Sequence, residues 1–134
     1  MSGHKEAEEM LLMARKDLKA LGHMRDAAKF DDAIFGFHAQ QAIEKALKAW
    51  LSLRERRYPF THNLRALLAL LEEEGCNAGR FMHVLRYSVF AIQFRYEEAV
   101  PLVESLDREA AIADAKAVVE HVERLIADAK PDAK

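Results

Sequence analysis

The chain has 134 residues, which fits a single domain, and its 51% apolar and 31% charged residues are typical of a globular protein. It contains only five glycines and three prolines, which favours long helices over turn-rich β structure. The net charge of -2 gives no electrostatic reason to expect binding to nucleic acid or to a membrane. The single cysteine excludes an intramolecular disulfide and cysteine-rich zinc sites. The sequence has no run of about 18 apolar residues, which a helix would need to span a bilayer.

Apolar residues recur with the helical period of about 3.6 residues in five segments. We expect helices over residues 5–21, 32–53, 62–74, 78–98 and 107–130. Gly22 is expected to end the first helix. Asp31 or Asp32 is expected to cap the second helix and to interact favourably with its dipole.

Turn and cap residues set the later boundaries. Pro59 stops the second helix from continuing, and Thr61 is expected to cap the third. Pro101 breaks the fourth helix, and Asp107 is expected to cap the fifth. Five helices without a strand signal predict an all-α, five-helix up-and-down bundle with short connections.

The bundle is expected to occupy about residues 5–129 of one domain that spans residues 1–134, followed by a frayed polar tail over residues 130–134. No hydrophobic region follows Met1, and we therefore expect the protein in the cytoplasm and not in a membrane.

The segment 32–53 has apolar residues around more than half of its circumference, among them Phe35, Ile43, Leu47 and Trp50. A helix of this kind is buried on several sides. We therefore expect it to be the central helix of the bundle.

The remaining strip of the second helix is polar. His38, Gln41, Lys45 and Lys48 follow one another at steps of three, four and three, which places them on one side of the helix. Their donors and positive charges could bind phosphate or a base edge, and the alternative is a hydrated strip on a buried helix. Gln40 lies off this strip and is expected to be a buried polar group with its hydrogen bonds satisfied.

A basic loop follows the second helix. It contains Arg54, Arg56 and Arg57 together with the aromatic residues Tyr58 and Phe60 and with His62. Arginines beside aromatic rings could bind a nucleotide or RNA through phosphate contacts and stacking. In metal-independent RNA cleavage, His62 could transfer a proton while Arg57 stabilises charge on the phosphate. The alternative is a hydrated loop.

Arg95 lies near the end of the fourth predicted helix, where it could reach phosphate or, alternatively, act as a cation that interacts favourably with the helix dipole.

The sequence has no histidines with metal-ligand spacing, no Walker loop and no nucleophile elbow. We therefore expect neither a metal site nor an intrinsic cofactor. Cys76 has no activating base beside it and is interpreted as a bystander.

Three motifs resemble the HEPN domain of prokaryotic proteins. The run Phe37-His38-Ala39-Gln40-Gln41-Ala42-Ile43-Glu44-Lys45-Ala46-Leu47-Lys48-Ala49 resembles the central helix of that family. Thr61-His62-Asn63-Leu64 resembles its "TH-x-L" element, and Arg95-Tyr96 resembles an Arg-Tyr pair found late in the family. With the order of the motifs and the five-helix pattern, the resemblance covers roughly residues 6–126.

The resemblance implies a helical bundle that forms homodimers and is similar to the substrate-binding domain of aminoglycoside-type nucleotidyltransferases. It also implies a separate minimal nucleotidyltransferase as partner, in a toxin–antitoxin module or a two-subunit transferase, with ATP or another nucleotide as a ligand. His38, Gln41, Lys45, Lys48 and Arg95 would then be the ligand-binding residues.

Two alternatives stay open. Some HEPN groups are RNases with an Arg-x(4–6)-His motif, but no histidine follows Arg95 at that spacing. Arg57 and His62 have this spacing, but at a different place in the chain. A ribonuclease toxin that acts on RNA is therefore the less favoured hypothesis. The third possibility is a purely structural dimeric interaction protein.

Overall fold

The computed structural model describes residues 2–91 and 106–129. All regular structure in these two ranges is helical, which confirms the predicted all-α class. The elements are α1 (Ser2–His23), α2 (Asp32–Leu53), α3 (Leu64–Glu73), the 3₁₀ helix η1 (Gly79–Tyr87) and α5 (Arg108–Asp128). None of the helices in these ranges is long and apolar enough to cross a membrane.

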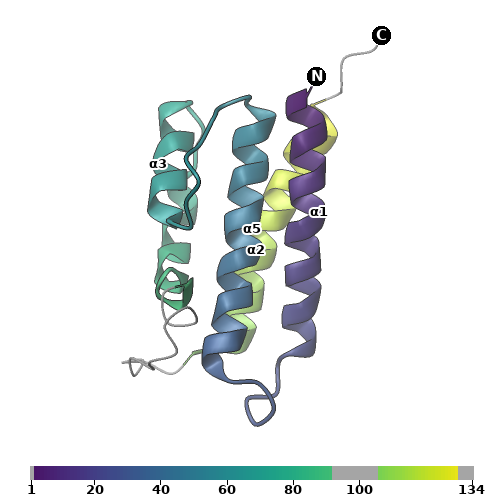
Figure 1. Ribbon diagram of the computed structural model, residues 1–134, viewed down its shortest axis with the longest axis vertical. Helices are drawn as coiled ribbons and strands as arrows, with labels where there is room; N and C mark the ends of the chain where they lie inside the picture. The colour runs from purple at the N-terminus through teal and green to yellow at the C-terminus, as the bar shows by residue number, and fades with distance from the viewer. Residues whose placement is uncertain (1, 92–105, 130–134) are drawn as a thin grey trace.

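Helix α2 is the centre of the bundle. It packs against α1 and α5 on one side and against α3 and η1 on the other (Figure 1). Phe35, Ile43, Leu47 and Trp50 are all buried, as expected for a helix enclosed on several sides. The predicted bounds of this helix, residues 32–53, are also those observed.

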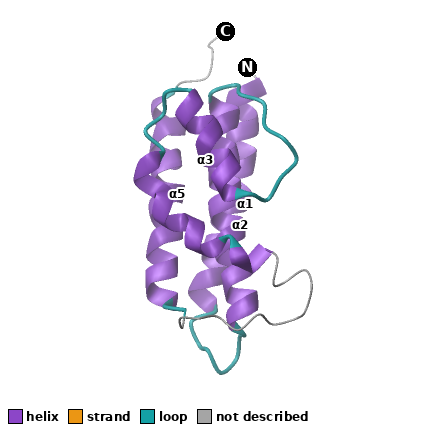
Figure 2. Cartoon of the chain, turned by 90° about the vertical axis from the view of Figure 1, so that its left-hand side faces the viewer, coloured by secondary structure: helices purple, strands orange, loops and turns teal. Residues whose placement is uncertain are grey.

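The connection over residues 54–63 turns back along the bundle and stands off the helices (Figure 2). Arg54, at the end of α2, donates a hydrogen bond to the carbonyl of Glu74 at the end of α3. His62, just before α3, contacts Glu44 in the middle of α2. Helices α2 and α3 therefore run in the same direction, whereas the sequence pattern predicts alternating directions with short connections.

Side-chain caps begin two of the helices. Asp107 caps α5 by accepting a hydrogen bond from the amide of Ala110, as predicted. Helix α3 begins later than predicted, because Asn63 and not Thr61 accepts the hydrogen bond from the amide of Ala66. The hydroxyl of Thr61 accepts instead from the amide of Asn63, which orients the capping residue.

The fourth predicted helix, over residues 78–98, is wrong in its type over residues 79–87. Residues 79–87 form a 3₁₀ helix, and residues 92–98 lie outside the described ranges. The buried residues are Phe81, Val84, Tyr87 and Phe90, which follow one another at steps of three. A 3₁₀ helix has 3.0 residues per turn, so this spacing keeps the buried side chains within η1, those of Phe81, Val84 and Tyr87, on one line. Met82, which follows Phe81 and lies off this line, is exposed.

A buried arginine ties α5 to the connection between α1 and α2. The guanidinium of Arg108 donates hydrogen bonds to the carbonyls of Met24 and Phe30, both at 2.6 Å, and to Asp32 Oδ1 at 2.8 Å. It also lies 4.8 Å from the ring centroid of Phe35. Three loop and helix-end positions are thus held by one side chain.

Small residues let other elements approach α2 closely. Gly36 and the buried alanines of α2 form a stripe at steps of three and four: Ala39, Ala42, Ala46 and Ala49. The ring of Phe90 lies directly over Gly36, so that a Cβ atom added there would be 2.3 Å from the ring. The glycine is therefore required by the close approach of an aromatic ring.

The substitution Gly36→Ala tests this contact. Because the added methyl group forces Phe90 to move, we expect the free energy of unfolding to fall by about 1–3 kcal/mol in urea denaturation. Gly22→Ala is the matched control, since its nearest neighbour would be an Arg25 side-chain atom at 3.6 Å. The control should be neutral or more stable by about 0.5–1 kcal/mol. Equal effects of the two substitutions would contradict the analysis.

Candidate functional site

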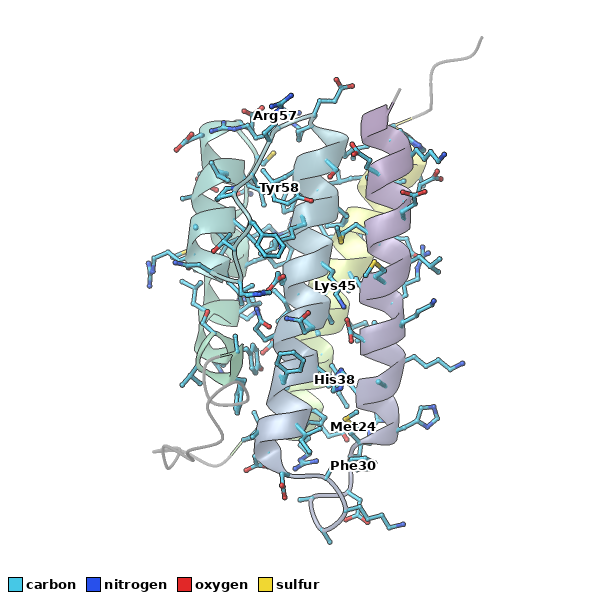
Figure 3. All side chains as sticks on the ribbon, in the orientation of Figure 1. Met24, Phe30, His38, Lys45, Arg57 and Tyr58 are labelled. Atoms are coloured by element: carbon cyan, nitrogen blue, oxygen red, sulfur yellow. The ribbon has the colours of Figure 1, made fainter. Side chains whose placement is uncertain are left out.

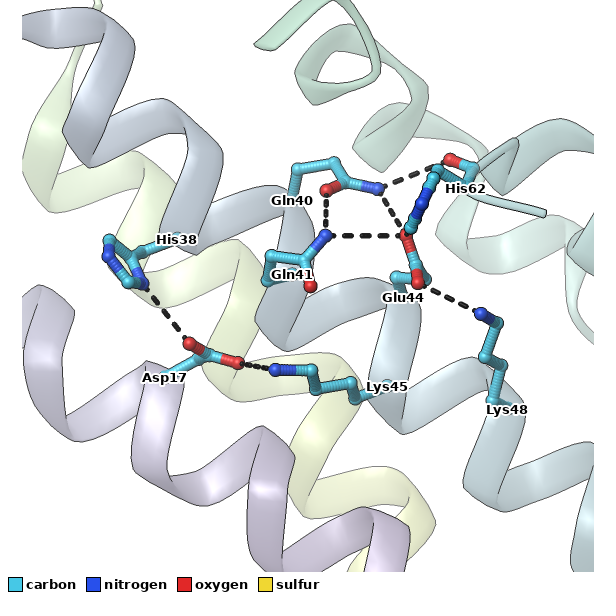
Figure 4. Close-up of polar contacts among 8 residues, drawn as sticks. All are labelled: Asp17, His38, Gln40, Gln41, Glu44, Lys45, Lys48 and His62. Carbon is cyan, nitrogen blue, oxygen red and sulfur yellow. Dashed lines mark hydrogen bonds and ion pairs between the residues drawn. The ribbon is translucent and has the colours of Figure 1, made fainter. Parts of the chain in front are cut away.

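A hydrogen-bonded group of side chains surrounds Glu44 on α2 (Figure 4). We call it the Glu44 network, and its members are Gln40, Gln41, Glu44, Lys48 and His62. Glu44 Oε1 accepts from Gln40 at 2.8 Å and lies 3.0 Å from Nδ1 of His62. Glu44 Oε2 accepts from Lys48 Nζ at 2.9 Å. Gln41 donates to Gln40 Oε1 at 2.8 Å and, more weakly, to Glu44 Oε1 at 3.5 Å.

The network is buried except at one edge. Glu44 is 3% exposed and Lys48 is 8% exposed, and Gln40 is fully buried. The side chain of His62 is 40% exposed, so the network reaches the surface there. Every buried side-chain nitrogen and oxygen in the described ranges has a hydrogen-bond partner, which confirms the interpretation of Gln40 as a satisfied buried group.

Burial and hydrogen bonds have opposite effects on the pKa of Glu44. Burial raises it, whereas hydrogen bonds from Gln40, Lys48 and His62 lower it, and the net pKa lies below the ordinary carboxyl value. Glu44 is therefore ionised in the folded protein at neutral pH. A carboxylate can only accept hydrogen bonds, so Nδ1 of His62 carries the proton that points at Glu44.

A second group of polar side chains lies between α1 and α2. Asp17 of α1 accepts from Lys45 Nζ at 2.7 Å, and its other oxygen lies 3.1 Å from Nδ1 of His38. Lys45 is 21% exposed at its side chain, more than Lys48, and an ammonium group has three donors of which Asp17 takes one. Lys45 is thus the more accessible of the two lysines.

The structure divides the predicted polar strip into two parts. His38 and Lys45 face Asp17 of α1, whereas Gln41 and Lys48 join Glu44, toward the start of α3. Each pair is seven residues apart, so the four residues form two neighbouring rows and not one. All four lie on α2 as predicted, and their binding of a ligand stays a prediction.

The sequence analysis gave no role to either of the two carboxylates that organise these rows, Glu44 and Asp17. Glu44 precedes Lys48 by four residues, and this spacing is typical of an ion pair on a helix, so the sequence carried a signal for it. Asp17 lies on a different helix, and only the packing of α1 against α2 brings it to Lys45.

Arg57 and His62 do not lie together within one chain. Arg57 lies near one end of the bundle (Figure 3), where it lines an open hollow with Gly3 and Ser52. His62 contacts Glu44, which precedes Ser52 by eight residues, or about 12 Å along the helix axis. The structure therefore gives no support within a single chain for a catalytic Arg57–His62 pair.

The other arginines of the loop have structural contacts. Arg54 binds the Glu74 carbonyl, and Arg56 forms ion pairs with Glu73 and Glu74. Arg57 has no hydrogen bond or ion pair with any residue that the structure describes.

Arg95, the remaining predicted ligand-binding residue, lies outside the described residues. Within residues 2–91 and 106–129, no three histidine, cysteine, aspartate or glutamate side chains are placed to hold a metal ion.

Replacing the central carboxylate tests the network. Glu44→Gln leaves Lys48 buried without a negative partner, and we expect the free energy of unfolding at pH 7 to fall by about 3–5 kcal/mol. Because the folded pKa of Glu44 lies below its ordinary value of 4.5, the stabilisation is complete above that value and is lost as the pH falls through the folded pKa. The difference between wild type and variant should therefore shrink below about pH 4.5.

Urea denaturation between pH 7 and pH 3.5 measures this effect. Glu123→Gln is the control, because Glu123 forms an exposed ion pair with Arg15. We expect the control to stay within about 0.5 kcal/mol of wild type. A pH-independent loss in Glu44→Gln would show that its charge is not what stabilises the fold.

Comparison with known proteins identifies the family. A model of the HEPN domain matches residues 7–125. Neither a search of curated proteins nor a search of solved structures gave a match. The matched region includes the Glu44 network, the polar residues facing Asp17 and all of the helix packing except its outermost ends. The chain therefore belongs to the HEPN-domain family.

Proposed function

We propose that the protein is a non-catalytic helical subunit that binds ATP or another nucleotide and acts with a separate minimal nucleotidyltransferase, in a pair of the toxin–antitoxin kind. Membership of the HEPN family supports a role of this type. The observation that carries the proposal is the arrangement of His38, Gln41 and Lys45 on α2, beside the Glu44 network. These side chains form a polar surface with fixed geometry on the most buried helix of the fold.

The chemistry of this surface suits a nucleotide. Lys45 is held by Asp17 and keeps two further donors, which can bind phosphate oxygens. His38 shares the same carboxylate and is partly exposed. Because both side chains are already oriented, little conformational entropy would be lost when a ligand binds. The transferase subunit would supply the catalytic metal and the group transfer.

Calorimetric titration with ATP and GTP tests this function, first with the protein alone and then with its cognate transferase. We expect binding below millimolar concentration and a loss of about tenfold in affinity in Lys45→Met, since one charged hydrogen bond contributes about 1.5 kcal/mol. Lys19→Met is the control, because Lys19 is exposed on α1. Failure of either nucleotide to bind at millimolar concentration, with and without the transferase, would overturn the proposal.

We further propose that the protein is a homodimer. Met82 of η1 and Val89 just beyond it are exposed although both are large and apolar. Phe81, Val84 and Tyr87 pack into the bundle, which leaves Met82 and Val89 on a different face of this segment. Burial of the second face against another copy would remove this apolar surface from water.

The double substitution Met82→Ser and Val89→Ser tests the dimer. If these residues lie in the interface, we expect dissociation to monomers in sedimentation velocity, because their apolar area would be exchanged for polar groups. The control is Leu12→Ser and Met13→Ser, which changes two exposed apolar residues on the outer face of α1. An unchanged dimer in the first variant, or dissociation of the control alone, would show that this face does not pair.

A further inference from the structure

The loop between α2 and α3 exposes one aromatic ring almost completely. Phe60 is 98% exposed, more than any other large apolar residue in the described part of the chain. Large apolar rings are usually buried or covered by a partner. Phe60 therefore requires an explanation beyond the packing of a single chain.

Phe60 is held in this position by contacts on both sides. Two residues before it, the ring of Tyr58 lies 5.7 Å from Lys48 Nζ. Two residues after it, His62 contacts Glu44 through its ring and accepts a hydrogen bond from Gln40 at its carbonyl. The Glu44 network thus anchors the backbone on each side of the exposed ring.

His62 presents a defined atom beside Phe60. The ring centroids of the two residues are 6.2 Å apart, with an angle of 59° between the ring planes. Because the Nδ1 proton points at Glu44, Nε2 of neutral His62 carries a lone pair and acts as a hydrogen-bond acceptor. No residue that the structure describes binds this Nε2 atom.

We propose that Phe60 and His62 bind the base of a nucleotide, with the base stacked on Phe60 and an exocyclic amino group of the base donating to His62 Nε2. This inference rests on the proposed function, and it assigns the part of the nucleotide that Lys45 does not bind. An aromatic ring supplies a stacking surface for a base, and an acceptor at its edge selects a base that carries an amino donor.

The distribution of charge favours a base over a phosphate at this edge. The carboxylate of Glu44 lies next to His62. Lys48, the lysine of the network, is buried, and its ammonium group donates a hydrogen bond to Glu44. Within the Glu44 network itself, no cation is left unpaired to offset a phosphate. The accessible ammonium group is that of Lys45, on the other row of α2.

Titration of the full chain with ATP and ITP tests the inference, since inosine carries an oxygen where adenosine carries its amino group. We expect wild type to bind ATP about two- to tenfold more tightly than ITP, the range of one hydrogen bond. Phe60→Ala should weaken both ligands by about tenfold through loss of stacking. His62→Phe should bind ATP and ITP with equal affinity. Leu12→Ala, at another exposed apolar residue, should bind both like wild type.

The outcomes separate this inference from the proposed function. If wild type binds ATP but Phe60→Ala binds it equally well, or if wild type does not distinguish ATP from ITP, only the base site is overturned. If Phe60→Ala loses binding of a single-stranded oligoribonucleotide and keeps binding of ATP, the ring belongs to an RNA surface and the inference is also overturned. If wild type binds no ATP with or without the transferase, the proposed function fails as well.

Phe60 makes almost no contact with the core, so we expect Phe60→Ala to fold like wild type. Circular dichroism checks that the variant is folded, so that a loss of binding is not due to unfolding.

Discussion

The buried carboxylate of Glu44 is the interaction on which the rest of the site depends. An ionised group inside a protein is strongly unfavourable unless other polar groups replace its lost water. Here four side chains do so: Gln40, Gln41, Lys48 and His62. Each of these contacts also fixes a position, and the contact from His62 fixes the approach of the chain to α3. Glu44 therefore helps to hold the end of the loop over residues 54–63 against the bundle.

The two rows of polar residues on α2 have different properties as a result. The row around Glu44 is mostly closed to solvent and holds its charges against each other. The row facing Asp17 is more open, and both of its basic side chains share one carboxylate. A ligand lying across α2 would meet the ammonium group of Lys45 on one row and the ring of His62 beside the other. This difference is what makes an extended ligand with two chemically distinct ends a better fit than a simple anion.

The sequence predicts the features that depend on local periodicity and misses those that depend on contacts between elements. The bounds of α2 and the cap at Asp107 follow from the hydrophobic pattern and from cap chemistry, and both are observed. Thr61 and Asn63 are both suitable cap residues, and the sequence alone does not show which of them begins α3; in the structure it is Asn63. The direction of α3 and the pairing of Lys45 with Asp17 likewise arise from tertiary packing. The motif-based resemblance identified the family but did not reveal that the polar strip has two rows.

The 3₁₀ geometry of η1 acts as a spacer of fixed length. At its start, the Glu72 carboxylate accepts hydrogen bonds from the amides of Ala78 and Gly79, and beyond its end Phe90 lies on Gly36. Nine residues rise about 18 Å in a 3₁₀ helix but only about 13.5 Å in an α-helix. As an α-helix the same residues would be about 4.5 Å shorter, and Phe81, Val84 and Tyr87 would no longer lie on one line. In the 3₁₀ form these nine residues thus cover more of the length between α3 and the contact of Phe90 with Gly36 than an α-helix would.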